Sequence, residues 1–248
     1  MAVSPDGAWL AVSYTGTGVI RVYATTPPYA LRRTIGLLGT GDRQLLYCPN
    51  KMCFTPTGNL LVCDFYNSRV QELTFDGEHV RSFAVPRPYS LALCGDVLAV
   101  GTLYSLYVRL LSYPSGAPLR DFESTESGDG RITGMRFTLD GRFLVVAENT
   151  NPRLSVFTVD GEFVCHIGAG LSKGWKDVAI DANCDVIVAE YGNHLMCVFP
   201  FDVGVKSKTW GNKGTADEKF EFPRALALVG ERLFMLNNYI HNHVQVFE

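Results

Sequence analysis

The sequence lacks the features that mark membrane proteins, disulfide-rich secreted proteins and small zinc-binding proteins. None of its apolar runs reaches the roughly 18 residues of a membrane-spanning helix, because Gly, Pro or a charged residue interrupts each one. Residues Met1–Gly7 form neither a basic nor an apolar leader, and the chain holds no N-x-S/T glycosylation site. Its 7 cysteines are odd in number and include no CxxC pair, which excludes a zinc knuckle or a thioredoxin motif. These absences predict a cytoplasmic protein with reduced cysteines and no membrane contact.

Charge is also scarce. Only 19% of the 248 residues are charged, and the formal net charge of −3 argues against a strongly basic nucleic-acid sleeve. Hydrophobic residues make up 47% of the chain, which is enough for a sizeable core. No segment keeps a helical period over 11 residues, whereas the 24 Gly, the 12 Pro and the 12% aromatic residues favour short strands joined by turns.

One unit recurs along the whole chain. It consists of an apolar strand, a turn that usually carries Gly, a second apolar strand, a polar loop and a third strand, as in the segment from Met52 to Leu73. A four-stranded unit that repeats about every 45 residues is typical of a β-propeller. The sequence therefore predicts an all-β, six-bladed β-propeller with four-stranded antiparallel blades in one domain, residues 1–248. The six repeats span residues 1–36, 50–84, 88–122, 132–168, 176–210 and 223–248.

Four of the six units resemble a known family. Ala189–Phe199 reads AEYGNHLMCVF, and Cys63–Gln71, Ala147–Phe157 and Asn237–Phe247 follow a similar pattern. These segments resemble the NHL repeat. The resemblance implies a six-bladed propeller with a surface for a ligand or a partner, and it implies no single activity.

The repeats supply one strand fewer than six full blades. The first unit starts in its innermost strand, and the last ends after its third strand at Val244–Phe247, so the last blade lacks its outermost strand. We expect either that the chain is a domain of something longer or that Met1–Val3 closes the ring by packing against the last blade. An unpaired strand at 244–247 would present an edge suited to self-association.

A polar motif, Asp/Glu-x-x-Asn-x-Arg, follows the second strand of two units, and a third unit keeps its first half. Two interpretations remain open: a ring of partner-binding groups around the channel mouth, or internal pairing of the carboxylate with Arg while Asn satisfies a tight turn. Recurrence in separate blades favours internal pairing. The motif residues are Asp64, Asn67 and Arg69, then Glu148, Asn151 and Arg153, then Glu190 and Asn193 with Leu195 in place of Arg; His194, beside Asn193, belongs to the same predicted rim.

Metal binding is a weaker hypothesis. His241 and His243 lie two residues apart, and a carboxylate such as Glu190 would complete a small ligand set for Ca²⁺ or Zn²⁺. Some six-bladed enzymes similar to this family, of the lactonase and amidating-lyase types, use such a channel-mouth site. The signal peptide, paired disulfides and additional histidines expected of a close relative are not visible here. We therefore expect no cofactor and no catalytic residue, and keep a metal-dependent hydrolase or lyase as the alternative.

Basic residues interleaved with aromatic residues occur in the segments between repeats. This composition suits either a solvated loop or a surface that stacks single-stranded RNA bases and contacts phosphates. If these segments share a face with the Asn-x-Arg loops, they extend the same partner-binding rim. The residues are Lys173, Trp175 and Lys176, then Lys206, Lys208, Trp210 and Lys213, with Lys51 in the corresponding segment before the second unit.

Together these features predict a non-enzymatic scaffold that presents a loop-rich rim to a protein or peptide. Binding of single-stranded RNA and metal-dependent catalysis are the two alternatives. Measuring the metal content of the purified protein would separate binding from metal-dependent catalysis.

Overall fold

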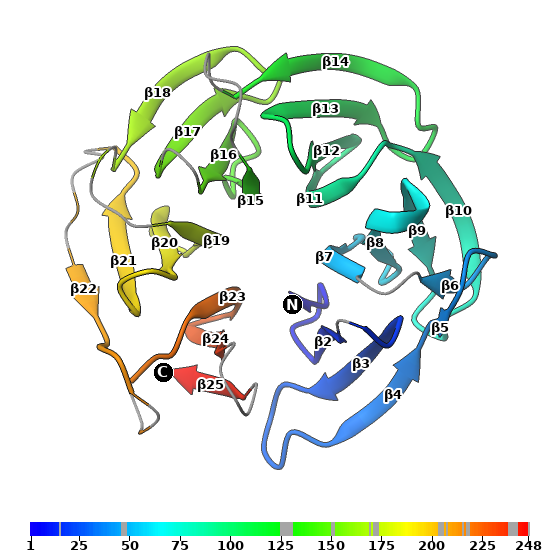
Figure 1. Ribbon diagram of the computed structural model, residues 1–248, viewed down its shortest axis with the longest axis horizontal. Helices are drawn as coiled ribbons and strands as arrows, with labels where there is room; N and C mark the ends of the chain where they lie inside the picture. The colour runs from blue at the N-terminus through cyan, green and yellow to red at the C-terminus, as the bar shows by residue number, and fades with distance from the viewer. Residues whose placement is uncertain are drawn as a thin grey trace.

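The strands form six sheets arranged as a ring, with the innermost strand of each sheet facing the central axis (Figure 1). The computed structural model describes residues 1–14, 16–45, 49–124, 131–149, 152–168, 170, 174–202, 206, 208–214, 216, 219–237 and 243–247. Five sheets have four strands and the sixth has three, and neighbouring strands within each sheet are antiparallel. The predicted six-bladed propeller, with a last blade that lacks its outermost strand, is confirmed.

Blades 1 to 3 occupy the first half of the chain. The short strands β5 (Leu37–Leu38) and β6 (Gln44–Leu45) pair in parallel between blades 1 and 2. A single 3₁₀ turn, η1 (Phe65–Asn67), follows β8. Blade 1 comprises β1 (Ala2–Val3), β2 (Trp9–Tyr14), β3 (Val19–Ala24) and β4 (Leu31–Ile35). Blade 2 comprises β7 (Pro49–Phe54), β8 (Leu60–Asp64), β9 (Arg69–Leu73) and β10 (His79–Ala84). Blade 3 comprises β11 (Pro88–Cys94), β12 (Val97–Thr102), β13 (Tyr107–Ser112) and β14 (Pro118–Glu123).

Blades 4 to 6 complete the ring. Blade 4 comprises β15 (Ile132–Phe137), β16 (Phe143–Glu148), β17 (Arg153–Thr158) and β18 (Phe163–Ile167). Blade 5 comprises β19 (Trp175–Ile180), β20 (Asp185–Glu190), β21 (Leu195–Pro200) and β22 (Lys208–Trp210). Blade 6 comprises β23 (Pro223–Val229), β24 (Arg232–Asn237) and β25 (Val244–Phe247). No helix among the described residues is long and apolar enough to cross a membrane.

The core lies between the blades. Both faces of the second strands are apolar, as in β8, where all five residues are buried. Each strand can therefore contribute to the packing against two neighbouring blades. Between blades 4 and 5 the buried cluster includes Val188, Trp175 and Phe199, and the two aromatic rings meet edge to face at 5.8 Å. Six such interfaces bury apolar residues around the whole ring. This arrangement agrees with the low share of charged residues in the chain.

Among the described residues, the contact between blades 1 and 6 has the fewest buried hydrophobic residues, 6 against 12 between blades 4 and 5, and its other apolar side chains are partly buried. Met1 packs there against Ala225 and Phe234, while β1 pairs with β2 through Ala2 and Ala11. The side chains of the N-terminal segment thus pack against blade 6 and close the ring. This packing of Met1–Val3 is one of the two expectations stated from the sequence. Figure 1 places the N-terminus close to the centre of the ring.

The topology gives the ring two different faces. One face, which we call the mouth rim, carries the loops between second and third strands, such as 65–68 and 191–194. It also carries the linkers between blades, such as 85–87. The opposite face carries the turns between first and second strands, such as 138–142, and between third and fourth strands. Each innermost strand from blade 2 onward starts at the mouth rim, so the first residues of these strands surround one end of the channel.

Candidate functional site

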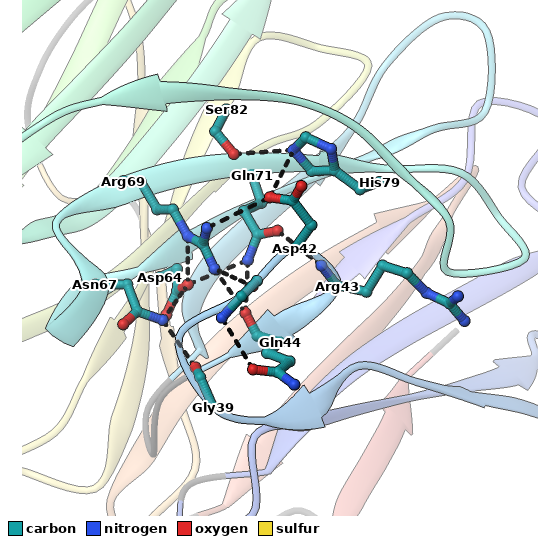
Figure 2. Close-up of polar contacts among 11 residues, drawn as sticks. Gly39, Asp42, Arg43, Gln44, Asp64, Asn67, Arg69, Gln71, His79 and Ser82 are labelled. Carbon is teal, nitrogen blue, oxygen red and sulfur yellow. Dashed lines mark hydrogen bonds and ion pairs between the residues drawn. The ribbon is translucent and has the colours of Figure 1, made fainter.

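The first predicted group, around Asp64, is a closed network of hydrogen bonds (Figure 2). The buried carboxylate Oδ2 of Asp64 accepts bonds from Asn67 Nδ2 at 2.8 Å, Arg69 Nε at 3.0 Å and Gln71 Nε2 at 3.1 Å. Three donors on one carboxylate explain how a charged group is accommodated without exposure, since each donor replaces a water molecule.

The same side chains also hold the linker between blades 1 and 2. Arg69 donates to the carbonyl oxygens of Gly41 at 2.6 Å and Gln44 at 3.0 Å, and Asn67 donates to that of Gly39 at 3.0 Å. Gln71 Nε2 donates to the carbonyl oxygen of Gln44 at 2.7 Å. The arrangement in Figure 2 therefore fits the internal-pairing interpretation, in which the motif fastens a loop.

Blade 4 repeats this arrangement with different residues. Glu148 is buried at the end of β16, and its Oε2 accepts a bond from Arg153 Nε at 3.2 Å. Ser155 donates to Oε1 of the same carboxylate, and its hydroxyl also contacts Nδ1 of His166 at 3.1 Å. Burial raises the pKa of Glu148, against the opposing effects of Ser155 and Arg153. Asn151 lies outside the described residues.

Blade 5 shows the same position without an arginine. Glu190 is buried at the end of β20 and accepts bonds from Asn193 Nδ2 and, at 3.3 Å, from the Cys197 thiol. Burial, followed by the Glu190 charge, raises the pKa of Cys197 to about 12, so this thiol is not a nucleophile at neutral pH. A buried carboxylate at the end of the second strand is thus a recurring structural element of three blades.

His194 joins blade 5 to the linker that leads into blade 6. Its Nδ1 accepts a bond from the backbone N–H of Phe222 at 3.2 Å, and the two rings lie 4.5 Å apart. Burial, followed by the nearby Lys213 charge, lowers the pKa of His194, while Glu221 opposes this shift. An unprotonated Nδ1 is the form that accepts the Phe222 bond.

The structure separates the predicted group of basic and aromatic residues. Trp175 is fully buried between blades 4 and 5. Lys208 and Trp210 lie in β22, the outer strand of blade 5, with the Lys208 ammonium 5.8 Å from the centre of the indole ring. Exposed Lys206 precedes that strand on the side of the opposite face, whereas exposed Lys213 follows it in the linker on the mouth rim. Lys173 lies outside the described residues.

In the part of the chain that the structure describes, no cluster of side chains supports the weaker hypothesis of metal binding. His243 Nε2 contacts Asn237 Nδ2 at 3.0 Å and Gln245 Nε2 at 3.2 Å, all within blade 6, whereas the polar partners of Glu190 lie in blade 5. No three described His, Cys, Asp or Glu side chains come together to hold a metal. His241 lies outside the described residues, so the pair with His243 stays a prediction.

A second group of residues lies at the channel mouth, and only Lys51 and Lys176 among them were named from the sequence, as basic residues of the segments between repeats. In each of blades 2 to 6 the innermost strand carries one extra residue near its start, relative to the second strand. Such a β-bulge redirects a side chain out of the sheet pattern. The side chains at these bulges line one cavity: Asn50 and Lys51, Tyr89, Thr133, Lys176 and Arg224, which we call the channel mouth.

The cavity measures about 530 Å³, a size typical of small-ligand pockets. Three of its lining residues, Lys51, Lys176 and Arg224, are cationic, and the described residues that line it include no Asp or Glu. Tyr14 and Tyr89 add phenol groups that donate hydrogen bonds. This chemistry suits a negatively charged ligand.

The cations of the channel mouth differ in their partners. The Lys51 ammonium lies 2.7 Å from the buried carboxylate of Asp177, which also accepts the backbone N–H of Leu226 at 2.9 Å. Lys176 has no ion pair among the described residues; its ammonium lies 5.0 Å from the centre of the Tyr191 ring. Burial, then the charges of Arg224, Arg131 and Lys51, lowers the pKa of Lys176. A nearby anion would relieve this repulsion.

Exposed aromatic side chains lie on the same rim. Tyr104, in the loop that follows β12, is 60% exposed, and the guanidinium groups of Arg87 and Arg131 lie 5.8 Å and 5.3 Å from its ring centre. Tyr66, in η1, is 59% exposed. Tyrosine and arginine are the residues that most often dominate protein interfaces. Arg131 links this group to the channel mouth, because its charge also acts on Lys176.

Comparison with known proteins agrees with the observed ring. The model of the NHL repeat matches residues 46–73, which include β7, β8 and β9 of blade 2. The chain thus contains an NHL repeat within a six-bladed β-propeller. No curated protein sequence matches it.

Two solved structures share the propeller fold with this chain. A catalytically inactive virginiamycin B lyase from Staphylococcus aureus, with quinupristin, superposes with a TM-score of 0.70 at 15% sequence identity, covering 94% of this chain and 74% of the lyase. Kuenenia stuttgartiensis hydrazine synthase gives a TM-score of 0.70 at 14% identity, covering 95% of this chain and 75% of that chain. At these identities the likeness establishes the fold alone.

Proposed function

We propose that this protein is a non-enzymatic binding scaffold whose mouth rim holds a protein or peptide partner. The six blades supply a rigid support, and the loops and linkers of the rim supply the contacts. NHL propellers as a class mediate protein interactions, and the match of residues 46–73 to the NHL repeat supports this proposal.

The observation that carries the proposal is the combination of an exposed Tyr104–Arg87–Arg131 group with a cationic cavity on one face. Aromatic and arginine side chains that are accessible yet held by mutual contacts lose little conformational freedom on binding. The Asn-x-Arg groups take part indirectly, because they fix the loops that form the rim. Asn193, His194 and Lys213 lie on the same rim and would extend the contact surface.

The test compares one substitution on each face. Tyr104→Asn removes the aromatic ring from the mouth rim, and Asn tolerates the positive φ of 65° at this position. Leu139→Asn is the matched control, since Leu139 is 66% exposed in the turn between β15 and β16 on the opposite face. Quantitative capture from a proteome should lose a set of proteins with Tyr104→Asn and keep it with Leu139→Asn. Identical capture by the two variants would contradict the proposal.

Single-stranded RNA is the competing partner class. The lysines that favoured it are divided between the two faces, with Lys206 and Lys208 away from the mouth rim and Lys213 on it. If the protein is a scaffold for proteins, we expect no salt-sensitive binding of RNA, even at low ionic strength. An RNA mobility shift that disappears in a Lys206→Glu/Lys208→Glu/Lys213→Glu variant would replace the protein-binding proposal.

The edge of blade 6 supports a second, weaker candidate, self-association. β25 is the last strand of its sheet, and its residues are all half-buried. An unpaired edge can add a strand from another copy. Sedimentation velocity should then show a concentration-dependent dimer that Val246→Pro abolishes. A monomer at high concentration would dismiss this candidate.

A further inference from the structure

The cavity at the channel mouth continues into the interface between blades 1 and 6, where its wall changes from basic to apolar. Lys176 and Arg224 lie at its basic end. Its apolar wall includes Leu10 and Val12 from β2, and Phe234 and Val246 from blade 6. A single pocket therefore offers positive charge at one end and apolar surface along its length.

Blade 6 lines this part of the cavity with residues of its second and third strands, and blade 1 lines it with residues of β2 and β3. Tyr23 and Tyr14 remain partly exposed, with their hydroxyl groups 2.8 Å apart. The exposed Arg21 guanidinium lies 4.7 Å from the centre of the Tyr14 ring.

We propose that this pocket binds the C-terminal end of a partner polypeptide, with the terminal carboxylate beside Lys176 and Arg224 and the last apolar side chains between blades 1 and 6. The inference rests on the proposed protein-binding function and names the part of the partner that is recognised. Charge complementarity and apolar surface within one cavity are the two observations that carry it.

A chain end fits this pocket better than an internal acidic residue. A terminal carboxylate is attached to the same residue as the last side chain, so negative charge and apolar surface enter together. An internal acidic residue continues the chain on both sides of its side chain, so its charge and a neighbouring apolar side chain belong to different residues. The cavity volume of about 530 Å³ limits recognition to a few terminal residues.

The charged neighbours of Lys51 and Lys176 differ, and this difference favours Lys176 as the partner of the terminal carboxylate. Lys51 already has Asp177 as its counter-ion at 2.7 Å. Lys176 is surrounded by the like charges of Arg224, Arg131 and Lys51, and these lower its pKa in addition to burial. Binding of a carboxylate therefore relieves repulsion at Lys176, whereas at Lys51 it would compete with an existing ion pair.

The test uses one short peptide with apolar last residues in two forms, a C-terminal free acid and a C-terminal amide, titrated calorimetrically. The two forms differ only in the charge that the proposal requires. We expect the free acid to bind about tenfold more tightly than the amide, with an affinity that falls as salt increases. Equal affinities of the two forms would overturn the proposal.

Variants locate the binding. Lys176→Met should bring the free acid down to the affinity of the amide, whereas Lys176→Arg should retain the preference because it keeps the charge. Lys208→Met on the outer strand of blade 5 is the control and should change neither affinity. A free-acid preference that survives a double Lys176→Met/Arg224→Met variant would also overturn the proposal, and thermal unfolding shows whether each variant is folded.

Two further results separate this inference from the proposed function. Octanoate supplies a carboxylate and an apolar chain without a peptide backbone, and tighter binding of octanoate than of the peptide would overturn the assignment to a polypeptide. If partner capture depends on Tyr104 while neither peptide form binds, the scaffold function stands and the C-terminal assignment fails. If the peptides bind as expected while the Tyr104→Asn variant captures the same proteins, the pocket binds chain ends but the role of the mouth rim in partner binding is contradicted.

Discussion

Two groups of basic side chains on the mouth rim differ in where their charge is neutralised. Arg69 is surrounded by protein acceptors, namely the buried Asp64 carboxylate and the carbonyl oxygens of Gly41 and Gln44. Lys176 lines a cavity, and the charges of Arg224, Arg131 and Lys51 act on it. Arg69 and Lys176 carry charge of the same sign on the same face, yet of these two only Arg69 has a carboxylate partner among the described residues.

This difference distinguishes structural from functional charge. A guanidinium whose donors end on the protein's own oxygens fixes a loop, and its removal would disturb the fold. A cation held beside like charges contributes electrostatic repulsion that only an outside anion can relieve. Substitutions in the two groups should therefore change stability in opposite directions.

The largest effect is expected at Asp64. Asp64→Ala leaves Arg69, Asn67 and Gln71 without their shared acceptor, and we expect the free energy of unfolding to fall by about 3 kcal/mol, as for other broken buried pairs. Urea denaturation measures this change. The control is Asp76→Ala, because Asp76 also pairs with an arginine, Arg33, at 2.6 Å, but its side chain is 67% exposed. An exposed pair contributes little, so equal losses in the two variants would contradict the closed-network account.

A smaller effect is expected at His194 when the pH is lowered. Its pKa lies below the ordinary value of 6.5, so the stability that its neutral form contributes is complete above pH 6.5. That stability is lost as the pH falls through 6.5 towards the lowered pKa. Protonation removes the acceptor for Phe222 N–H, a bond worth about 1 kcal/mol.

The matched variant for this prediction is His194→Asn. Asn tolerates the positive φ of 59° and offers a side-chain oxygen that does not titrate. Thermal unfolding between pH 7 and pH 5 should show a smaller loss of stability for His194→Asn than for the unchanged protein. If both proteins lose the same stability between pH 7 and pH 5, the pH dependence arises from a group other than His194.

The smallest effect, and the one of opposite sign, is expected at Lys176. Lys176→Met removes a cation that its neighbours repel, so we expect the free energy of unfolding to rise by about 0.5 kcal/mol, the low end for stabilising substitutions. The gain is small because Lys176 is only partly buried and water screens its charge. The same urea experiment measures it, with Lys208→Met as the control. A loss of stability as large as that of Asp64→Ala would show that Lys176 is structural.

The fold was predictable because its signals are local. The turn at Pro56–Gly58 and the apolar segment Leu60–Cys63 recur in every blade with changes of detail, and a ring of sheets is the arrangement that buries such strands on both faces. The internal role of Asp64 and Arg69 could also be predicted from the sequence, because a structural requirement repeats from blade to blade.

The sequence pointed to Lys51 and Lys176 as basic residues between repeats, but it did not predict that they share one cavity with Arg224, because only closure of the ring brings these residues together. Lys176 and Arg224 each look like an ordinary polar residue at the start of a strand. One signal was present: three innermost strands start with Pro, at Pro49, Pro88 and Pro223, followed by the residue that the bulge directs into the cavity. The separation of Lys208 from Lys213 was missed for a related reason, since it depends on which residues form the outer strand of blade 5.

The most direct test of the account is a crystal structure of the protein with a free-acid peptide whose last residues are apolar. The account predicts the terminal carboxylate within hydrogen-bond distance of Lys176 Nζ and the Arg224 guanidinium, with the last side chain against Phe234. A peptide bound on another surface, or with its carboxylate in solvent and the channel mouth empty, would contradict it.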